Sequence, residues 1–197
     1  MTERIEDNTS ERQAMRREML ARRAALSPAT RAAASARMVR HLLQALAPPR
    51  IVAFCWPIKY EPDIRAVLVP WMAEGALAAL PVVLAPATPL AFRLWTAQTP
   101  MMEDRYGIPT PASGDFVQPD LILLPLNGFD AQGYRLGYGG GFFDRTLAVL
   151  SPRPLVVGVG FEINRLDTIQ PEIHDQRVDW IITEDGAFRP QFSSIRA

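Results

Sequence analysis

Residues 121–150, LILLPLNGFDAQGYRLGYGGGFFDRTLAVL, contain the pattern around which the rest of the chain is organised. Residues 121–124 form a short apolar run that ends at Pro125, as a buried strand does, and residues 142–150 have helical spacing. The glycines between them therefore occupy a turn between a strand and a helix. Ligands of open α/β sheets bind at such turns.

The glycine-rich turn has the properties of an anion site. Four of the five residues 137–141 lack a Cβ atom, namely Gly137, Gly139, Gly140 and Gly141. Their backbone N–H groups can crowd around a phosphate at the positive end of a helix that begins near Phe142. Tight turns also use glycine for geometry alone, so the glycines by themselves leave both interpretations open.

Two charged residues flank this turn and favour phosphate chemistry. Arg135 precedes the glycines and Asp144 follows them. An arginine can donate two hydrogen bonds to a phosphate, and a carboxylate can bind Mg²⁺. Phosphoryl transfer needs both a cation that pairs with phosphate and a ligand for the metal. The two common phosphate motifs are excluded, because Phe142 stands where a dinucleotide fingerprint needs glycine and no Gly-Lys-Ser/Thr ending follows the glycines.

The run from Gly133 to Arg145 resembles the signature of the 5-formyltetrahydrofolate cyclo-ligases, also called methenyltetrahydrofolate synthetases. The resemblance continues in the same order outside this run and covers most of residues 11–186; its further segments are residues 61–63, 80–83, 92–95, 106–111, 174–175 and 183–184. It implies ATP- and Mg²⁺-dependent conversion of 5-formyltetrahydrofolate to 5,10-methenyltetrahydrofolate, with release of ADP and phosphate.

The resemblance also implies roles for individual residues. It implies that Arg135 and Asp144 are catalytic and that Asp144 and Asp175 bind Mg²⁺. The expected ATP-binding residues are Arg12, Arg16, Arg135, Leu136, Gly137, Tyr138, Gly139, Gly140, Gly141, Phe142 and Phe143. The expected folate-binding residues are Trp56, Glu61, Trp95, Tyr138, Gly139, Gly140, Gly141 and Phe142.

Three positions depart from the family pattern. Arg12 stands where a lysine is usual; it keeps the charge but has a planar fork in place of a point-like ammonium. Phe142 and Phe143 stand where tyrosines are usual, so any contact that such a hydroxyl makes is missing here.

Several of these residues also have a purely structural interpretation. A helix is expected from a capping box at Ser10 and Gln13 to about residue 26, with Arg12, Arg16 and Arg23 along one edge, where they could simply form a solvated basic face. Trp95 could belong to the core. His174 lies beside Asp175, but adjacent side chains usually point apart, so a catalytic dyad is not expected.

Alternating strands and helices predict a single three-layer α/β/α sandwich with a mostly parallel sheet. The resemblance implies a fold of the same kind, related to that of sugar-phosphate isomerases and CoA transferases. Further strands are expected at residues 51–56, 77–84, 90–95, 155–159 and 180–183, and helices at residues 28–46 and 64–74. Residues 98–119 are expected to form loops, and residues 185–197 a tail. We expect one domain over residues 10–197, preceded by a flexible tail at residues 1–9.

The composition limits the choice of partners. Formal net charge is 0 and 48% of residues are hydrophobic, which argues against an extended nucleic-acid surface. No apolar run reaches the roughly 18 residues that span a bilayer, and no signal peptide is recognisable, so we expect a cytoplasmic protein without a membrane partner. A monomer is the default expectation, although no feature of the sequence determines the oligomeric state.

Two alternative functions remain open from the sequence. One is an ATP-using enzyme that acts on another folate or amide. The other is a non-enzymatic nucleotide- or RNA-binding descendant of the same fold, which is favoured by 10 basic against 5 acidic residues in positions 1–50.

Overall fold

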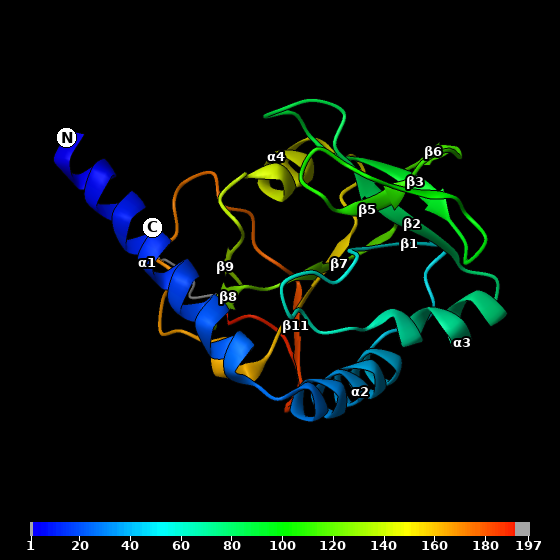
Figure 1. The fold of residues 1–197 in the computed structure, drawn as a ribbon, viewed down its shortest axis with the longest axis horizontal. Coiled ribbons are helices and arrows are strands. Elements are labelled where there is room, and N and C mark those ends of the chain that lie inside the picture. Colours follow the sequence, from blue (N-terminus) through cyan, green and yellow to red (C-terminus); the bar gives the residue numbers. More distant parts are fainter. Residues whose placement is uncertain (1, 192–197) are drawn as a thin grey trace.

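The computed structural model describes residues 2–191, with side chains described from residue 10 onward. Its centre is an eight-stranded sheet in the order β12-β11-β10-β7-β1-β2-β3-β6 (Figure 1). The middle strands are mutually parallel: β11 (Trp180–Thr183), β10 (Leu155–Val159), β7 (Leu121–Pro125), β1 (Ile51–Phe54) and β2 (Leu77–Val82). At the edges β12 (Gly186–Phe188), β3 (Ala91–Trp95) and β6 (Phe116–Val117) pair antiparallel. The predicted mostly parallel sheet is confirmed.

The sheet is covered on both faces because its strands alternate between two apolar cores. In β1, Val52 and Phe54 belong to one core and Ala53 to the other. Helices α2 (Pro28–Ala45) and α3 (Leu68–Ala73) pack on the first face, and α4 (Phe142–Val149) covers the second through Leu147 (Figure 1). Strands buried on both faces are typical of parallel sheets. The three predicted layers are therefore present.

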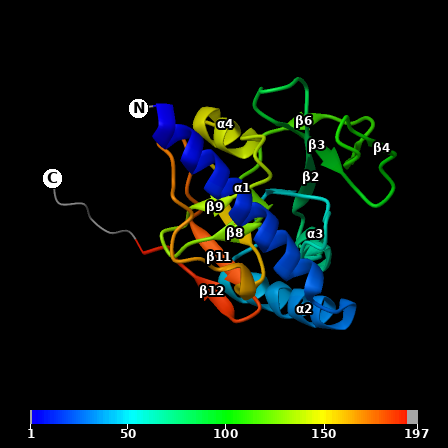
Figure 2. The ribbon, with the colours of Figure 1, turned by 60° about the vertical axis from the view of Figure 1, so that its left-hand side comes forward.

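Helix α1 (Thr2–Ala25) lies outside these layers and crosses the small hairpin β8–β9 (Figure 2). Met19 anchors it, because that side chain is fully buried and the Nδ2 of Asn164 donates to its carbonyl at 3.3 Å. The predicted capping box at Ser10 is wrong, because Ser10 lies within the continuous helix. The next helix begins as predicted, with the Ser27 hydroxyl accepting from Thr30 N at 3.1 Å and Pro28 in the first turn.

A hairpin separates β7 from the glycine-rich turn. Strands β8 (Gly128–Phe129) and β9 (Arg135–Leu136) pair antiparallel, and Asp130 closes their connection by accepting from the backbone of Gln132 and Tyr134 at 3.1 and 3.0 Å. The glycines therefore follow a hairpin rather than the core strand itself. Strands of two residues are too short to leave a periodic pattern, which is why the sequence did not predict them.

Other short elements also differ from expectation. The segment predicted as loops contains β4 (Met101–Glu103), β5 (Pro109–Pro111) and β6, and the predicted tail contains β12. Residues 192–197 of that tail lie outside the described residues. The helix predicted at residues 64–74 is a 3₁₀ turn, η1 (Arg65–Val67), followed by α3, and a second 3₁₀ turn, η2 (Glu162–Asn164), lies under α1. Over the described range no helix is long and apolar enough to cross a membrane.

Candidate active site

A cavity of about 590 Å³ lies between α1, the glycine loop (residues 137–141) and the segment 170–176. Most of the predicted phosphate and metal residues line it, although they come from distant parts of the chain. The lining residues are Arg12, Gln13, Arg16, Arg17, Arg135, Gly137, Tyr138, Gly139, Gly141, Asp144, Glu172, His174 and Asp175.

Arg135 and Asp144 face the same cavity and contact each other. Nη2 of Arg135 lies 2.9 Å from Oδ1 of Asp144, and the same oxygen accepts from Gln176 N at 3.0 Å. Arg135 also donates to the carbonyl oxygen of Gln176. Arg135 is buried and Asp144 is partly exposed, with side-chain exposures of 5% and 20%. The pair therefore fixes the segment 170–176 beside the start of α4.

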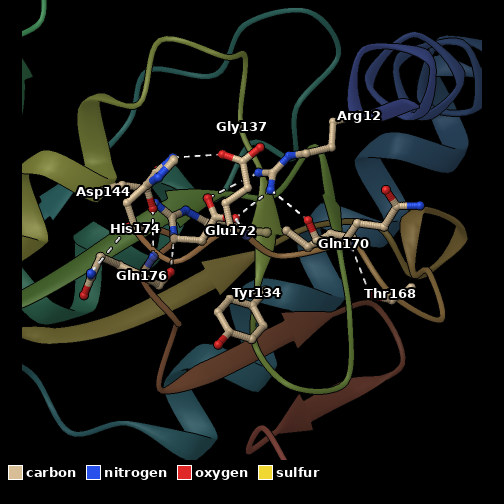
Figure 3. A network of polar contacts seen from close by, with 12 residues as sticks. Arg12, Tyr134, Gly137, Asp144, Thr168, Gln170, Glu172, His174 and Gln176 are labelled. Carbon is tan, nitrogen blue, oxygen red and sulfur yellow. Dashed lines mark hydrogen bonds and ion pairs between the residues drawn. The ribbon is translucent and has the colours of Figure 1, made fainter. Parts of the chain in front are cut away.

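Arg12 and Asp175 form a second ion pair on the other side of the cavity. Their Nη1–Oδ2 and Nη2–Oδ1 distances are 2.6 and 3.2 Å, and Arg12 also donates to the carbonyl of Gln170 at 3.0 Å. Figure 3 shows Arg12 reaching from α1 toward Gln170 and Glu172. Glu172 contributes its backbone N–H to Asp175 at 2.8 Å. The predicted cation and the predicted metal ligand thus neutralise each other here.

Glycines give the loop that borders the cavity backbone conformations that other residues rarely adopt. Gly139 and Gly141 have φ values of 95° and 61°, which side chains with a Cβ rarely adopt. Gly141 is the residue before α4, and no side chain caps that helix. The N–H groups of its first turn therefore have no intrahelical partner and remain available to an anion. Arg16 supports the loop from α1 by donating from Nε to the carbonyl of Gly137 at 3.0 Å.

The lining carries slightly more positive than negative charge. Four arginines face three carboxylates, since Arg12, Arg16, Arg17 and Arg135 stand against Asp144, Glu172 and Asp175. Burial, and then the neighbouring charge of Arg12, lower the pKa of Arg16 from its ordinary value. This crowding of cations indicates a site built for an anionic ligand.

Asp144 and Asp175, the two predicted metal ligands, both line the cavity and carry the carboxylate groups that Mg²⁺ takes. Mg²⁺ commonly takes one or two carboxylates and completes its shell with phosphate oxygens and water. Oδ2 of Asp144 has no hydrogen bond within residues 10–191, whereas both oxygens of Asp175 are bonded to Arg12. Among the same residues no cluster of three or more acidic, histidine or cysteine side chains could hold a metal alone. A metal would thus need the ligand's own oxygens, and Arg12 would have to release Asp175.

Beside the cavity, a chain of hydrogen bonds reaches the buried Glu61. The hydroxyl of Tyr138 donates to Oε1 of Glu61 at 2.5 Å and accepts from Nη2 of Arg23 at 2.9 Å. Glu61 is only 8% exposed, and burial raises the pKa of its carboxyl although Tyr138 and nearby cations act in the opposite direction. Tyr138 also lines the cavity, so it connects the phosphate side of the site to Glu61.

The remaining predicted residues do not line the cavity. Trp56 and Trp95 pack against each other at a centroid distance of 6.2 Å and also lean on the core. Leu136 is fully buried, and Phe143 packs on the second core. The ring of Phe142 lies 5.8 Å from that of Tyr106. Gly140 is exposed on the loop and is absent from the lining.

The structure excludes the structural alternative for two arginines of α1 and adds lining residues that the sequence did not indicate. A solvated basic face is wrong for Arg12 and Arg23, which are 5% and 0% exposed. Arg17 and Glu172 line the cavity but belong to no recognisable pattern, and Gln13, which the sequence assigns to a capping box, also lines it. His174 approaches Glu172, with 3.1 Å between Nε2 and Oε2, while Asp175 is engaged by Arg12. The side chains of these two neighbours therefore have different partners.

Comparison with known proteins gives a consistent result. The model of the 5-formyltetrahydrofolate cyclo-ligase family matches residues 8–184. A 5-formyltetrahydrofolate cyclo-ligase of Haemophilus influenzae is 29% identical over 178 residues, which are 85% of this chain and 95% of that protein. One from Mycolicibacterium smegmatis is 30% identical over 142 residues, covering 68% and 73%.

Two solved structures have the same fold. The Aquifex aeolicus 5,10-methenyltetrahydrofolate synthetase superimposes with a TM-score of 0.77 at 26% identity, covering 94% of this chain and 96% of that one. The Mycoplasma pneumoniae 5,10-methenyltetrahydrofolate synthetase superimposes with a TM-score of 0.72 at 24% identity, covering 88% and 98%.

Proposed function

This chain belongs to the 5-formyltetrahydrofolate cyclo-ligase family, and we propose that it converts 5-formyltetrahydrofolate to 5,10-methenyltetrahydrofolate with consumption of ATP. The observation that carries this proposal is the pairing of cations and carboxylates around one glycine-lined cavity. The cavity holds arginines for phosphates, free backbone donors at the start of α4, and two aspartates suited to Mg²⁺.

The chemical difficulty lies in the formyl group on N5. Its oxygen is a poor leaving group when N10 attacks the formyl carbon to close the ring. Transfer of the γ-phosphoryl group of ATP to the formyl oxygen breaks the bond to ADP and turns that oxygen into part of a phosphate. N10 then adds to the activated carbon and releases its proton to solvent, and phosphate leaves with the former formyl oxygen.

The protein promotes these steps by position and charge. Arg135, Arg12 and Arg16 would pair with phosphate oxygens, and the N–H groups of the glycine loop would cradle the polyphosphate. Asp144 and Asp175 would hold Mg²⁺, which when bound supplies positive charge to the phosphates. No covalent nucleophile is required, which agrees with a lining rich in arginines, glycines and carboxylates.

The folate would lie on the Glu61 side of Tyr138. A carboxylate suits the amino and N–H donors of a reduced pterin, and Glu61 is buried, where such bonds are strong. Trp56 and Trp95 offer adjacent aromatic surfaces for the pterin or its aryl tail. In this arrangement Gly139, Gly140, Gly141 and Phe142 lie between the two substrates. We also propose that the protein acts as a monomer without a nucleic-acid partner.

A substrate panel tests this function. The protein is mixed with Mg²⁺ and ATP together with 5-formyltetrahydrofolate, 10-formyltetrahydrofolate or a simple N-formyl amine, and methenyl absorbance and ADP are followed. ADP and methenyl product should form together only with 5-formyltetrahydrofolate. Equal ADP release with another amide would assign a different substrate, and nucleotide binding without any turnover would indicate a binding protein.

A further inference from the structure

Arg145 belongs to α4, the helix that follows the glycine loop, and its side chain contacts that loop (Figure 1). Its Nη2 donates to the carbonyl of Gly140, and its guanidinium carbon lies 5.3 Å from the centre of the Phe142 ring. Its Nε is buried and has no hydrogen-bond partner within residues 10–191. Among the same residues no carboxylate forms an ion pair with it. The Gly140 carbonyl is therefore the acceptor that holds this guanidinium.

Gly141 leaves the space that the guanidinium occupies. A Cβ atom on Gly141 would stand 2.8 Å from Nη1 of Arg145, so that any other residue here would push the arginine away. Gly141 also has a φ of 61°, a conformation that favours glycine. The glycine at this position therefore serves both the turn into α4 and the placement of Arg145.

The bond to Arg145 also determines the direction of one peptide group in the loop. The peptide between Gly140 and Gly141 is trans. In a trans peptide the carbonyl and the N–H point in opposite directions. Because the Gly140 carbonyl points to Arg145, the Gly141 N–H points away from Arg145.

The side of the loop opposite Arg145 is the side of the cavity. Gly139 and Gly141 line the cavity, whereas Gly140 and Arg145 are absent from its lining. The Gly141 N–H is therefore directed to the cavity side, and within residues 10–191 it has no backbone acceptor. It is a donor for an anionic ligand next to the N–H groups that begin α4.

The two glycines by themselves do not fix this direction. Neither residue has a Cβ atom, and glycine adopts positive and negative φ about equally well, so the chain permits the opposite orientation of their peptide. In that orientation the Gly140 carbonyl oxygen would face the ligand and repel phosphate. The hydrogen bond from Arg145 stabilises the orientation in which the N–H faces the cavity, and this preorganises the donor.

We propose that Arg145 is a positioning residue, which holds the Gly140–Gly141 peptide so that the Gly141 N–H donates to a phosphate group of the bound nucleotide. This inference rests on the proposed function, because it takes the anionic ligand to be ATP. Arg145 acts from the far side of the loop and does not touch the phosphate itself.

Steady-state kinetics of Arg145→Met test this role. The variant should raise KM for ATP by about 10-fold, as expected for loss of one hydrogen bond to a charged group. KM for 5-formyltetrahydrofolate should stay at the wild-type value, because the Gly141 N–H faces the nucleotide. Arg145→Lys should recover most of the ATP affinity, since its ammonium can still donate to the Gly140 carbonyl. Circular dichroism checks that both variants are folded.

A matched control removes an arginine elsewhere. Arg153 is partly exposed, pairs with Asp179 at 2.8 Å and is absent from the cavity lining. Arg153→Met should therefore leave both KM values unchanged.

Amide NMR of the full chain separates positioning from a direct contact between Arg145 and phosphate. The isotope-labelled protein is saturated with a non-hydrolysable ATP analogue and Mg²⁺. The Gly141 amide proton should shift downfield in the wild type and in Arg145→Lys, because it then donates to phosphate. In Arg145→Met the shift should be clearly smaller even at saturation, because the peptide is no longer held.

The outcomes separate the two proposals. An unchanged KM for ATP in Arg145→Met, an equal rise in both KM values, or a full downfield shift of the Gly141 amide in that variant overturns the inference and leaves the proposed function standing. A wild-type protein that neither binds the analogue nor turns over 5-formyltetrahydrofolate overturns both.

Discussion

The guanidinium of Arg12 and the carboxylate of Asp175 form a buried two-pronged ion pair between residues 163 positions apart, with distances of 2.6 and 3.2 Å. This pair joins α1 to the segment 170–176 and closes one side of the cavity. It also leaves both charges compensated while no ligand is bound. In the proposed function the ion pair breaks when the ligands bind: Arg12 then contacts phosphate, and Asp175 contacts Mg²⁺.

Arg12→Met should destabilise the protein and weaken ATP binding. It leaves Asp175 buried without its cation, and breaking a buried pair in this way costs about 3 kcal/mol or more. Urea denaturation and nucleotide titration measure the two effects. Arg22→Met on the same helix removes an exposed pair with Glu18 and a hydrogen bond to the carbonyl of Ile163, and should cost only about 1–2 kcal/mol. Equal effects of the two variants would contradict the role given to Arg12.

Asp144→Asn should lower turnover by about 100-fold or more, because a neutral amide is a poor metal ligand and gives Arg135 no charged partner. The amide oxygen can still accept from Gln176 N and from Arg135, so the variant should remain folded, with a lower thermal midpoint because the buried Arg135 loses its charged partner. Steady-state kinetics and circular dichroism measure both quantities. The exposed Asp167, outside the cavity lining, supplies the matched control Asp167→Asn. A fully active Asp144→Asn would remove this residue from the metal assignment.

The sequence predicted the middle of the sheet and the cavity loop, because both depend on local pattern. The runs at β7, β10 and β11 are short and apolar, and the glycines between Arg135 and Asp144 mark a turn into a helix. The arrangement of α1 could not be predicted in this way. Helical spacing places Arg12 and Arg23 on one edge, but their burial depends on Asp175, Tyr138 and Lys59, which lie far along the chain.

The pH dependence of stability should reveal the buried Glu61. Burial raises the pKa of this carboxyl above its ordinary value of 4.5, while Tyr138, Ile58, Arg23 and Lys59 act against the rise. A raised pKa means that the folded state holds the proton more tightly than the unfolded state. The contribution is favourable below pH 4.5 and is lost as pH rises through the folded pKa.

Glu61→Gln removes this titration. The free energy of unfolding of the variant minus that of the wild type should therefore increase as pH rises from the ordinary pKa of a glutamate toward neutrality, because only the wild type loses stability over this range. Denaturation curves at several pH values measure this trend. The opposite slope would mean that Glu61 is stabilised as a carboxylate.

Phe142→Tyr should strengthen binding of one of the two substrates. The family pattern has a tyrosine here, and one additional hydrogen bond is worth about 1 kcal/mol, or roughly 5-fold in KM. Phe142 packs edge-on against Tyr106 next to the glycine loop, and a hydroxyl on its ring adds little bulk. Its thermal midpoint should not change. If KM for both ATP and folate stays at the wild-type value, the missing hydroxyl has no role in this protein.

The central claim is that the glycine-lined cavity transfers the terminal phosphoryl group of ATP to the formyl oxygen of the folate. The most direct measurement uses 5-formyltetrahydrofolate whose formyl oxygen carries a heavy isotope, with mass analysis of the phosphate released as methenyl product appears. The account predicts that the heavy oxygen is recovered in that phosphate. Unlabelled phosphate released together with methenyl product would show that the formyl oxygen never bonds to phosphorus, and would contradict the account.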